Sequence, residues 1–236
     1  MHQNLSKIDN IPPWFLFIFS FGVLGFTALI FQVVFARNLV LLFGLTAPAV
    51  STVLAVFFFG LALGSFFFGK ISDRLSPKGN TRLYTSLFVF TGIYGFLFPF
   101  LFKLLNLLII FINSVYALDF SGFSFIAFIL AFIFLAPPAI LFGAGFPIVS
   151  KLFIHKGDGI GKKISFLYFA NTFGGVIGAA LAGFWLIPAF GNTATIFSAA
   201  SFVILVGGLL FYLFKTRNES VVVQDERLAE EDFSHE

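Results

Sequence analysis

The sequence predicts an all-α fold, a polytopic membrane bundle of six transmembrane helices, on the strength of three observations. Of the 236 residues, 59% are hydrophobic and 11% are charged, which is far outside the range of soluble domains. Six apolar runs reach the roughly 20 residues that a helix needs to cross the hydrocarbon core. Lys and Arg gather in the segments on one side of these runs, as expected of a membrane protein.

The predicted transmembrane domain covers residues 1–215. Its first apolar run lacks an early small-residue cleavage site and is followed by further runs, so we interpret it as a retained helix rather than a signal peptide. The predicted spans lie at about 14–36, 48–69, 83–102, 123–150, 164–187 and 193–214.

Few polar side chains fall within the spans, and none of the 11 Asp and Glu residues does. Gln32 in the first span, and Asn171 and Thr172 in the fifth, are the main ones. Because an amide is costly against lipid, Gln32 and Asn171 should face the bundle interior. There they serve either as interhelical hydrogen bonds or as ligand contacts, which makes all three residues candidates for a cavity or gate.

Small residues recur four apart in the second and fifth spans. Lipid gives helices little hydrophobic drive to associate, so close backbone approach through small residues must supply the attraction. These faces predict either tight packing or a smooth sliding surface for substrate gating, and the sequence leaves both open. The candidate packing residues are Gly60, Gly64, Gly174, Gly175, Gly178 and Gly183.

A shorter apolar piece, residues 104–118, follows Pro99 and the third span. Its polar residues fall on one side of a helical wheel, as in a helix that lies along the membrane surface. We therefore expect an interfacial helix here rather than another crossing. The polar residues of this face are Lys103, Asn106, Asn113 and Ser114.

Prolines interrupt the fourth span, where LAPPAILFGAGFPIV holds Pro137, Pro138 and Pro147. Each proline removes a helical hydrogen bond and opposes the preceding turn. A broken helix at membrane depth is tolerated where it is buried in protein or lines a cavity. Pro137 and Pro138 are thus candidates for a cavity wall, and a purely structural kink is the alternative.

The charges predict the topology. With six spans and a cytoplasmic start, all of the 14 Lys and Arg residues except Arg37 and Lys103 fall on the cytoplasmic side. Both termini are then cytoplasmic, and the protein is expected in a bacterial inner membrane with the lipid bilayer as its surroundings. The acidic segment 216–236 is predicted to be a disordered tail, either simply solvated or a docking segment for a basic partner.

The composition argues against catalysis by the usual side chains. There is no cysteine, and the three histidines, His2, His155 and His235, are far apart. We expect no catalytic, cofactor or metal site, and therefore no enzyme activity. The net charge of +3 is explained by topology and does not indicate nucleic acid binding.

Several segments together resemble one family. FTALIFQVVFARNLVLLFG, AVSTVLAVFFFGLALGSFFFGKISDR and LYFANTFGGVIGAALAGFWLIPAFG are similar to the membrane domain of fused major-facilitator/spermidine-synthase-like proteins, and LAPPAILFGAGFPIV resembles its double-proline helix. The resemblance covers about residues 20–215 and implies a bundle like one half of a major facilitator. It also implies association with an aminopropyltransferase-like soluble domain, which this chain does not carry. Gln32 stands where the family usually has glutamate.

The loop GKISDRLSPKGNTR also resembles the loop after the second span of major facilitators. The resemblance implies that Asp73 interacts with a helix terminus and basic neighbours and helps to close the cytoplasmic side. Ser76 replaces a customary glycine, and a plain topology signal is the alternative. The residues of this loop pattern are Gly69, Asp73, Arg74 and Lys78.

Three function hypotheses follow. The first is a non-catalytic membrane module that anchors a separate spermidine-synthase-like enzyme or other partner subunit, or exchanges a small metabolite with it. The second is a half-size facilitator-like transporter that acts as a dimer. The third is a structural subunit of a larger membrane complex. Polyamine is suggested by the family alone, and the lack of carboxylates in the spans argues against a site for a polycation.

Overall fold

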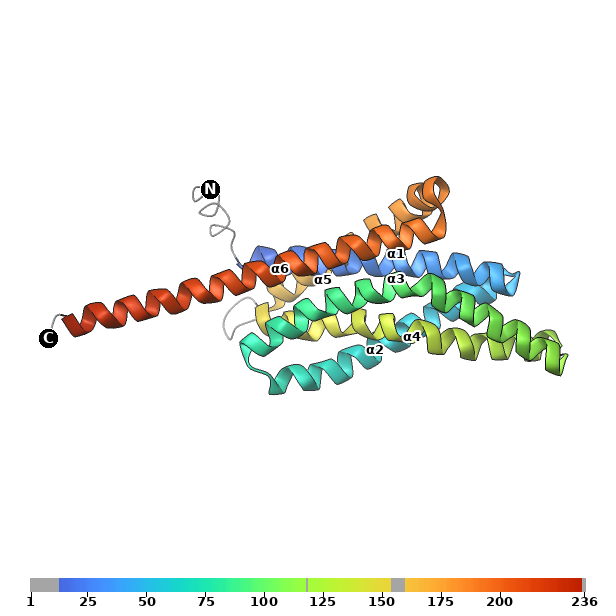
Figure 1. Ribbon diagram of the computed structural model, residues 1–236, viewed down its shortest axis with the longest axis horizontal. Coiled ribbons are helices and arrows are strands. Elements are labelled where there is room, and N and C mark those ends of the chain that lie inside the picture. The colour runs from blue at the N-terminus through green and yellow to red at the C-terminus, as the bar shows by residue number, and fades with distance from the viewer. Residues whose placement is uncertain (1–12, 118, 154–159, 235–236) are drawn as a thin grey trace.

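The computed structural model describes residues 13–117, 119–153 and 160–234, and in these ranges the chain is helical apart from short connections. Figure 1 shows long helices running side by side. The prediction of an all-α fold is therefore confirmed. The elements are α1 (Pro13–Phe43), α2 (Thr46–Arg74), α3 (Pro77–Tyr116), α4 (Phe120–Phe153), α5 (Ile160–Leu181), the π-helical turn η1 (Ala182–Leu186) and α6 (Ile187–Ser234).

Five helical segments of the described chain are long and apolar enough to cross a membrane. The last of them, Ile160–Lys215, joins the predicted fifth and sixth spans. Gly191 divides it, with φ 79° and ψ 173°, a backbone conformation outside the helical region. Figure 1 shows α5 and η1 meeting α6 at one end of the bundle, where the chain turns back.

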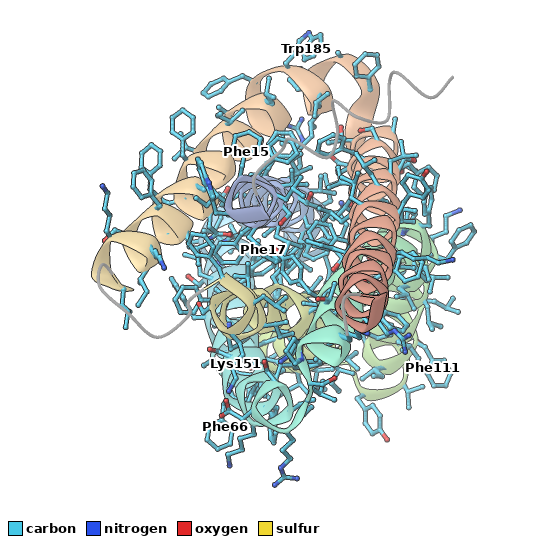
Figure 2. All side chains as sticks on the ribbon, turned by 90° about the vertical axis from the view of Figure 1, so that its left-hand side faces the viewer. Phe15, Phe17, Phe66, Phe111, Lys151 and Trp185 are labelled. Carbon is cyan, nitrogen blue, oxygen red and sulfur yellow. The ribbon has the colours of Figure 1, made fainter. Side chains whose placement is uncertain are left out.

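The helix α1 lies at the centre of the bundle. It packs most extensively on α5 and also contacts α6, α2 and α4 (Figure 2). In its most apolar window 56% of the residues are buried, against 22–39% in the other four segments. The outer helices therefore leave most of their apolar side chains for lipid.

Glycines allow the two most extensive helix pairs, α2 with α4 and α1 with α5, to approach backbone to backbone. A Cβ atom on Gly64 would overlap the carbonyl oxygen of Ile140, and one on Gly178 would overlap that of Phe26. Of the predicted packing glycines, only Gly183 has no atom near such a Cβ. An added Cβ atom would overlap or press tightly against a neighbouring helix at Gly60, Gly64, Gly174, Gly175 and Gly178.

The prolines of α4 do not break the helix, which runs continuously past Pro137, Pro138 and Pro147. Pro138 is buried and has no N–H to offer the carbonyl of Phe134, four residues earlier. The hydroxyl of Tyr94 on α3 donates to that carbonyl instead. A neighbouring helix thus supplies the missing donor, so the helix continues where the sequence suggested a break.

Residues 104–116 form no separate helix, contrary to our expectation, because α3 continues through Pro99 to Tyr116. Leu105 and Ile109 are buried, so the continuation keeps an apolar face packed. The side chains of Asn106 and Ser114 hydrogen bond to carbonyls of their own helix, which removes their need for the membrane surface. With 40 residues α3 is about 60 Å long, about twice the hydrocarbon thickness, so one end must leave the core.

The acidic segment after the last span is also helical in the structure, where disorder was expected. The backbone of α6 continues through Ser234 and projects well beyond the other helices (Figure 1). The sequence of residues 216–234 contains neither proline nor glycine, and its four Glu and two Arg residues favour helix.

Candidate functional site

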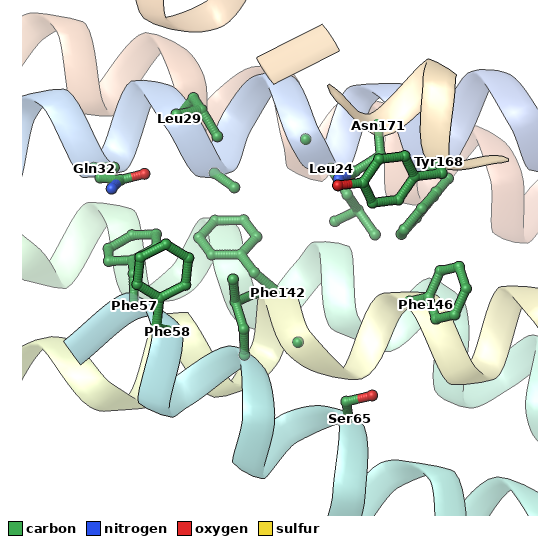
Figure 3. Close-up of a pocket in the computed structure, with 15 residues that line it drawn as sticks. Leu24, Leu29, Gln32, Phe57, Phe58, Ser65, Phe142, Phe146, Tyr168 and Asn171 are labelled. Carbon is green, nitrogen blue, oxygen red and sulfur yellow. The ribbon is translucent and has the colours of Figure 1, made fainter. Parts of the chain in front are cut away.

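A cavity of about 490 Å³ lies between α1, α2, α4 and α5 (Figure 3). Its size is in the range of small-molecule sites in proteins. We call it the central groove. Its lining residues are Phe21, Leu24, Gly25, Ala28, Leu29, Gln32, Phe57, Phe58, Leu61, Ser65, Phe142, Gly143, Phe146, Tyr168 and Asn171.

The floor of the central groove is shaped by close packing of glycines. Gly25 of α1 faces the backbone and side-chain oxygen of Asn171, so a side chain larger than hydrogen would push α5 away. Gly143 of α4 faces the backbone of Leu61 on α2 in the same way. These contacts fix the spacing within two of the helix pairs that line the groove, α1 with α5 and α2 with α4.

Aromatic rings make up much of the wall. Phe57 of α2 stacks with Phe142 of α4 at 6.3 Å between ring centroids, and Phe21 of α1 lies 6.0 Å from Phe146. Rings that pack against one another in this way form a rigid apolar surface. Phe58 is 68% exposed and stands at the rim of the groove.

Two amides from different helices face this groove. Gln32 and Asn171 are both half-buried, and neither side chain hydrogen bonds to another residue of the described ranges. Figure 3 shows them at opposite ends of the groove. Because Asn171 contacts α1 at Gly25, seven residues before Gln32, the two amides are about 10 Å apart along the helix axis.

The other polar side chains of the groove are the hydroxyls of Ser65 and Tyr168, and none of its lining residues in the described part of the chain is charged. Gly143 also lines the groove, and its carbonyl receives no hydrogen bond from Pro147 four residues later, because proline has no N–H. The groove therefore combines aromatic faces with uncharged donors and acceptors.

The structure brings together two of the five predicted cavity residues. Gln32 and Asn171 line the central groove, while Thr172 lines a separate surface pocket beside Tyr168. Pro137 is exposed and Pro138 is buried, and neither lines the central groove. The lining residues of α4 lie one to two turns further along the same proline- and glycine-rich segment.

The sequence reasoning did not single out the aromatic residues of the groove or Ser65. With 40 phenylalanines in the chain, no pattern separates the few that line a cavity from those that face lipid. Ser65 follows Gly64, and this neighbouring packing glycine was the one available sign that the position lies near a helix contact.

The loop between α2 and α3 forms a second polar cluster. Asp73 does not pair with its neighbours Arg74 and Lys78, and its carboxylate instead bonds the Lys151 ammonium at the end of α4, at 2.6 Å. Both side chains of this pair are largely exposed to solvent. The loop therefore links the ends of α2 and α4. A Cβ atom on Gly69 would lie within van der Waals distance of Pro147 on α4.

Ser76, where major facilitators customarily have glycine, has a clear local role. It is the N-cap of α3, and its hydroxyl accepts a hydrogen bond from the amide of Gly79 at 3.2 Å. Next to it, the buried Asn80 donates to the carbonyl of Ser72 at 3.0 Å. The turn is thus held by its own side chains.

Among the described residues, no group of three His, Asp or Glu side chains could hold a metal ion. No protein-family model, curated protein sequence or solved structure matches the chain. The function must accordingly be argued from the central groove and the bundle around it.

Proposed function

We propose that this protein is a half-size membrane carrier whose central groove binds a small organic solute with at most one positive charge. Gln32 and Asn171 carry the proposal, because two half-buried amides without hydrogen-bond partners among the described residues face the same groove from different helices. An amide in an apolar bundle is costly unless a ligand, water or another polar group bonds to it. The aromatic walls suit the apolar part of such a solute or a single cationic group.

We propose further that the chain crosses the membrane six times and works as a pair. The turn at Gly191 supports this proposal, because two spans on either side of it, added to the four before them, would leave both described chain ends on the same side. The rim of the groove on α2 and α5, with Phe58 and Tyr168, is exposed in a single copy. A second copy over this rim would keep the polar groups of the groove away from hydrocarbon.

The helix pairing supports this proposal. The α1–α5 contact corresponds to the α4–α2 contact. In the same way, the α1–α6 contact corresponds to the α4–α3 contact. Exchanging the first three helices with the last three therefore reproduces these contacts, although α1 packs on α2 far more extensively than α4 packs on α5. Such internal repeats, with a substrate site where they meet, are typical of secondary transporters.

The test uses the absence of cysteine from the native sequence. Ser65→Cys in the groove should react with a water-soluble thiol reagent in reconstituted vesicles. Ile133→Cys, on α4 outside the groove and 60% exposed, should face lipid and stay unreactive. In parallel, native mass spectrometry should find a particle of twice the 26.0 kDa chain mass. An unreactive Ser65→Cys in a strictly monomeric particle would contradict the proposal.

A second candidate function is a non-catalytic membrane module that anchors a soluble partner protein or exchanges a small metabolite with it. The length of α6 favours this function. The part of α6 after residue 215 projects beyond the bundle and offers a binding surface outside the membrane. Co-purification from native membranes with the full chain, compared with a chain truncated after Lys215, tests this. A soluble protein retained equally by both chains, or by neither, would argue against a role for α6.

A further inference from the structure

A second cavity, of about 540 Å³, opens at the end of the bundle where α1 and α5 begin and α4 ends. Figure 2 looks onto this end and labels Phe17 of α1. We call this cavity the terminal pocket. It is separate from the central groove and shares no residue with it. Its lining residues are Trp14, Phe17, Ile18, Leu152, Phe153, Lys162, Lys163 and Phe166.

The terminal pocket has an apolar interior and a basic rim. Phe17 is 8% exposed and stacks with Phe214 at 5.2 Å, so the inner wall is firmly packed. Lys162 and Lys163 stand in the first turn of α5, the former exposed and the latter half-buried. The other six lining residues are all hydrophobic.

Neither lysine forms a salt bridge with an acidic side chain among the described residues. The salt bridge in this part of the chain joins Lys151 to Asp73. The first turn of α5 also contains no acidic residue. Adjacent like charges at this end of a helix oppose the helix dipole, so a bound anion would relieve an unfavourable arrangement. The positive charge of the rim therefore favours the binding of a negatively charged group.

The position of the pocket decides which kind of anion fits. Trp14 stands at the start of α1, 52% exposed, where tryptophan is favoured at the boundary between headgroups and hydrocarbon. The basic rim lies beside it and the apolar wall runs inward along α1 towards Ile18. This order of charge and then hydrocarbon matches a lipid with an anionic headgroup.

We propose that the terminal pocket binds an anionic phospholipid, with its phosphate at Lys162 and Lys163 and an acyl chain against Trp14 and Phe166. Basic pockets between membrane helices on one side of a bilayer recognise anionic lipids by this combination. An inorganic anion would leave the apolar wall unused, and a zwitterionic lipid would bring its own positive charge beside the two lysines and add no net negative charge. The proposal is independent of what the central groove carries.

Native mass spectrometry of the full chain in detergent, with phosphatidylglycerol or phosphatidylcholine of matched acyl chains, tests it. Phosphatidylglycerol should be retained preferentially. The double variant Lys162→Gln/Lys163→Gln should lose roughly ten- to thirtyfold in its affinity. The matched control Lys78→Gln/Arg82→Gln removes two exposed charges from α3 and should stay within about twofold.

Three further measurements separate a lipid site from its alternatives. Trp14→Ala should weaken phosphatidylglycerol binding severalfold, and inorganic phosphate should not displace the lipid. Lys162→Arg/Lys163→Arg should retain it, which would show that a loss in the Gln variant is not misfolding. Equal losses in the test and control double variants, equal retention of both lipids, or displacement by inorganic phosphate would each overturn the proposal.

Discussion

The hydroxyl of Tyr94 on α3 donates a hydrogen bond to the carbonyl oxygen of Phe134 on α4. In an unbroken helix that oxygen would accept from residue 138, but Pro138 has no N–H. Tyr94 therefore replaces the intrahelical donor, and the bond joins two helices at the position where one of them is weakest. This explains why α4 stays continuous through its double proline.

The exchange of donors predicts that Tyr94 and Pro138 are energetically coupled. Tyr94→Phe removes the donor and should destabilise the bundle by about 0.6–1.7 kcal/mol, the range for interhelical hydrogen bonds in membranes. In a Pro138→Ala background, residue 138 again offers an N–H to the carbonyl of Phe134. Tyr94→Phe should therefore lower the unfolding free energy clearly less in that background. A double-mutant cycle of unfolding free energies in mild detergent measures the difference.

The matched control for this cycle is Tyr84→Phe. Tyr84 is also buried and hydrogen bonds to Ser20 at 3.0 Å, but its partner is no carbonyl freed by proline. Tyr84→Phe should lower the unfolding free energy by the same amount with or without Pro138→Ala. If Tyr94 and Tyr84 behave alike in the two backgrounds, the donor replacement does not stabilise α4.

Close backbone contact predicts very different effects for two glycines of the same helical region. Gly178→Ala would place its Cβ against the carbonyl of Phe26 and should cost about 1–3 kcal/mol, as overpacking does. Gly183→Ala has open space around its Cβ and should leave the melting temperature in detergent nearly unchanged. Equal melting temperatures for the two variants would mean that α1 and α5 are not as close as described.

These glycines also show what the sequence can and cannot predict about this fold. A four-residue spacing identifies the helix face, which is why it singles out Gly174 and Gly178, where an added Cβ atom would overlap α1. It does not show where the partner helix ends, so it also singles out Gly183, where an added Cβ atom would have no atom of the described residues within 4 Å. The packing of Gly92 and Gly207 between α3 and α6 carries no such spacing and was missed.

Tertiary contacts account for the errors in helix boundaries. Pro99 and the polar residues after it suggested a break, but the buried Leu105 and Ile109 keep α3 packed and continuous. Hydropathy alone cannot weigh such contacts against the cost of one proline. Likewise, amides in apolar spans predicted that Gln32 and Asn171 face inward, and both line the central groove. Which phenylalanines join them depends on the helix pairing, which the sequence does not reveal.

The exposed ion pair between Asp73 and Lys151 should contribute little to stability. Lys151 is 47% and Asp73 70% exposed, and exposed pairs are typically worth less than about 1 kcal/mol. Asp73→Asn should therefore change the unfolding free energy by only a few tenths of a kcal/mol at low salt, and by less at 0.5 M salt. A large loss that persists in high salt would point instead to a role in holding α2 against α4.

The gathering of basic residues at one end of the bundle predicts its orientation. Lys78 lies at the start of α3 and Asn113 near its other end, and both are exposed. In intact cells a membrane-impermeant maleimide should label Asn113→Cys, and it should label Lys78→Cys only after permeabilisation. The reverse pattern would invert the topology. Labelling of both from outside would show that α3 does not cross the membrane.

The uncharged lining of the central groove predicts how its specificity can be changed. Spermidine should not protect Ser65→Cys from a water-soluble thiol reagent, because no carboxylate of the groove balances its charges. Gln32→Glu places an acid at one end of the groove at nearly constant volume. At a pH where this acid is ionised, spermidine should protect Ser65→Cys in the Gln32→Glu background. Raising the salt concentration should weaken the protection.

The control for this change is Asn106→Asp, which adds the same charge to α3 outside the groove. It should leave Ser65→Cys unprotected by spermidine. Protection in the native background would mean that the groove already accepts a polycation, contrary to the proposed charge limit. Equal protection in the Gln32→Glu and Asn106→Asp backgrounds would show an effect of net charge, whereas protection confined to Gln32→Glu would place the solute beside residue 32.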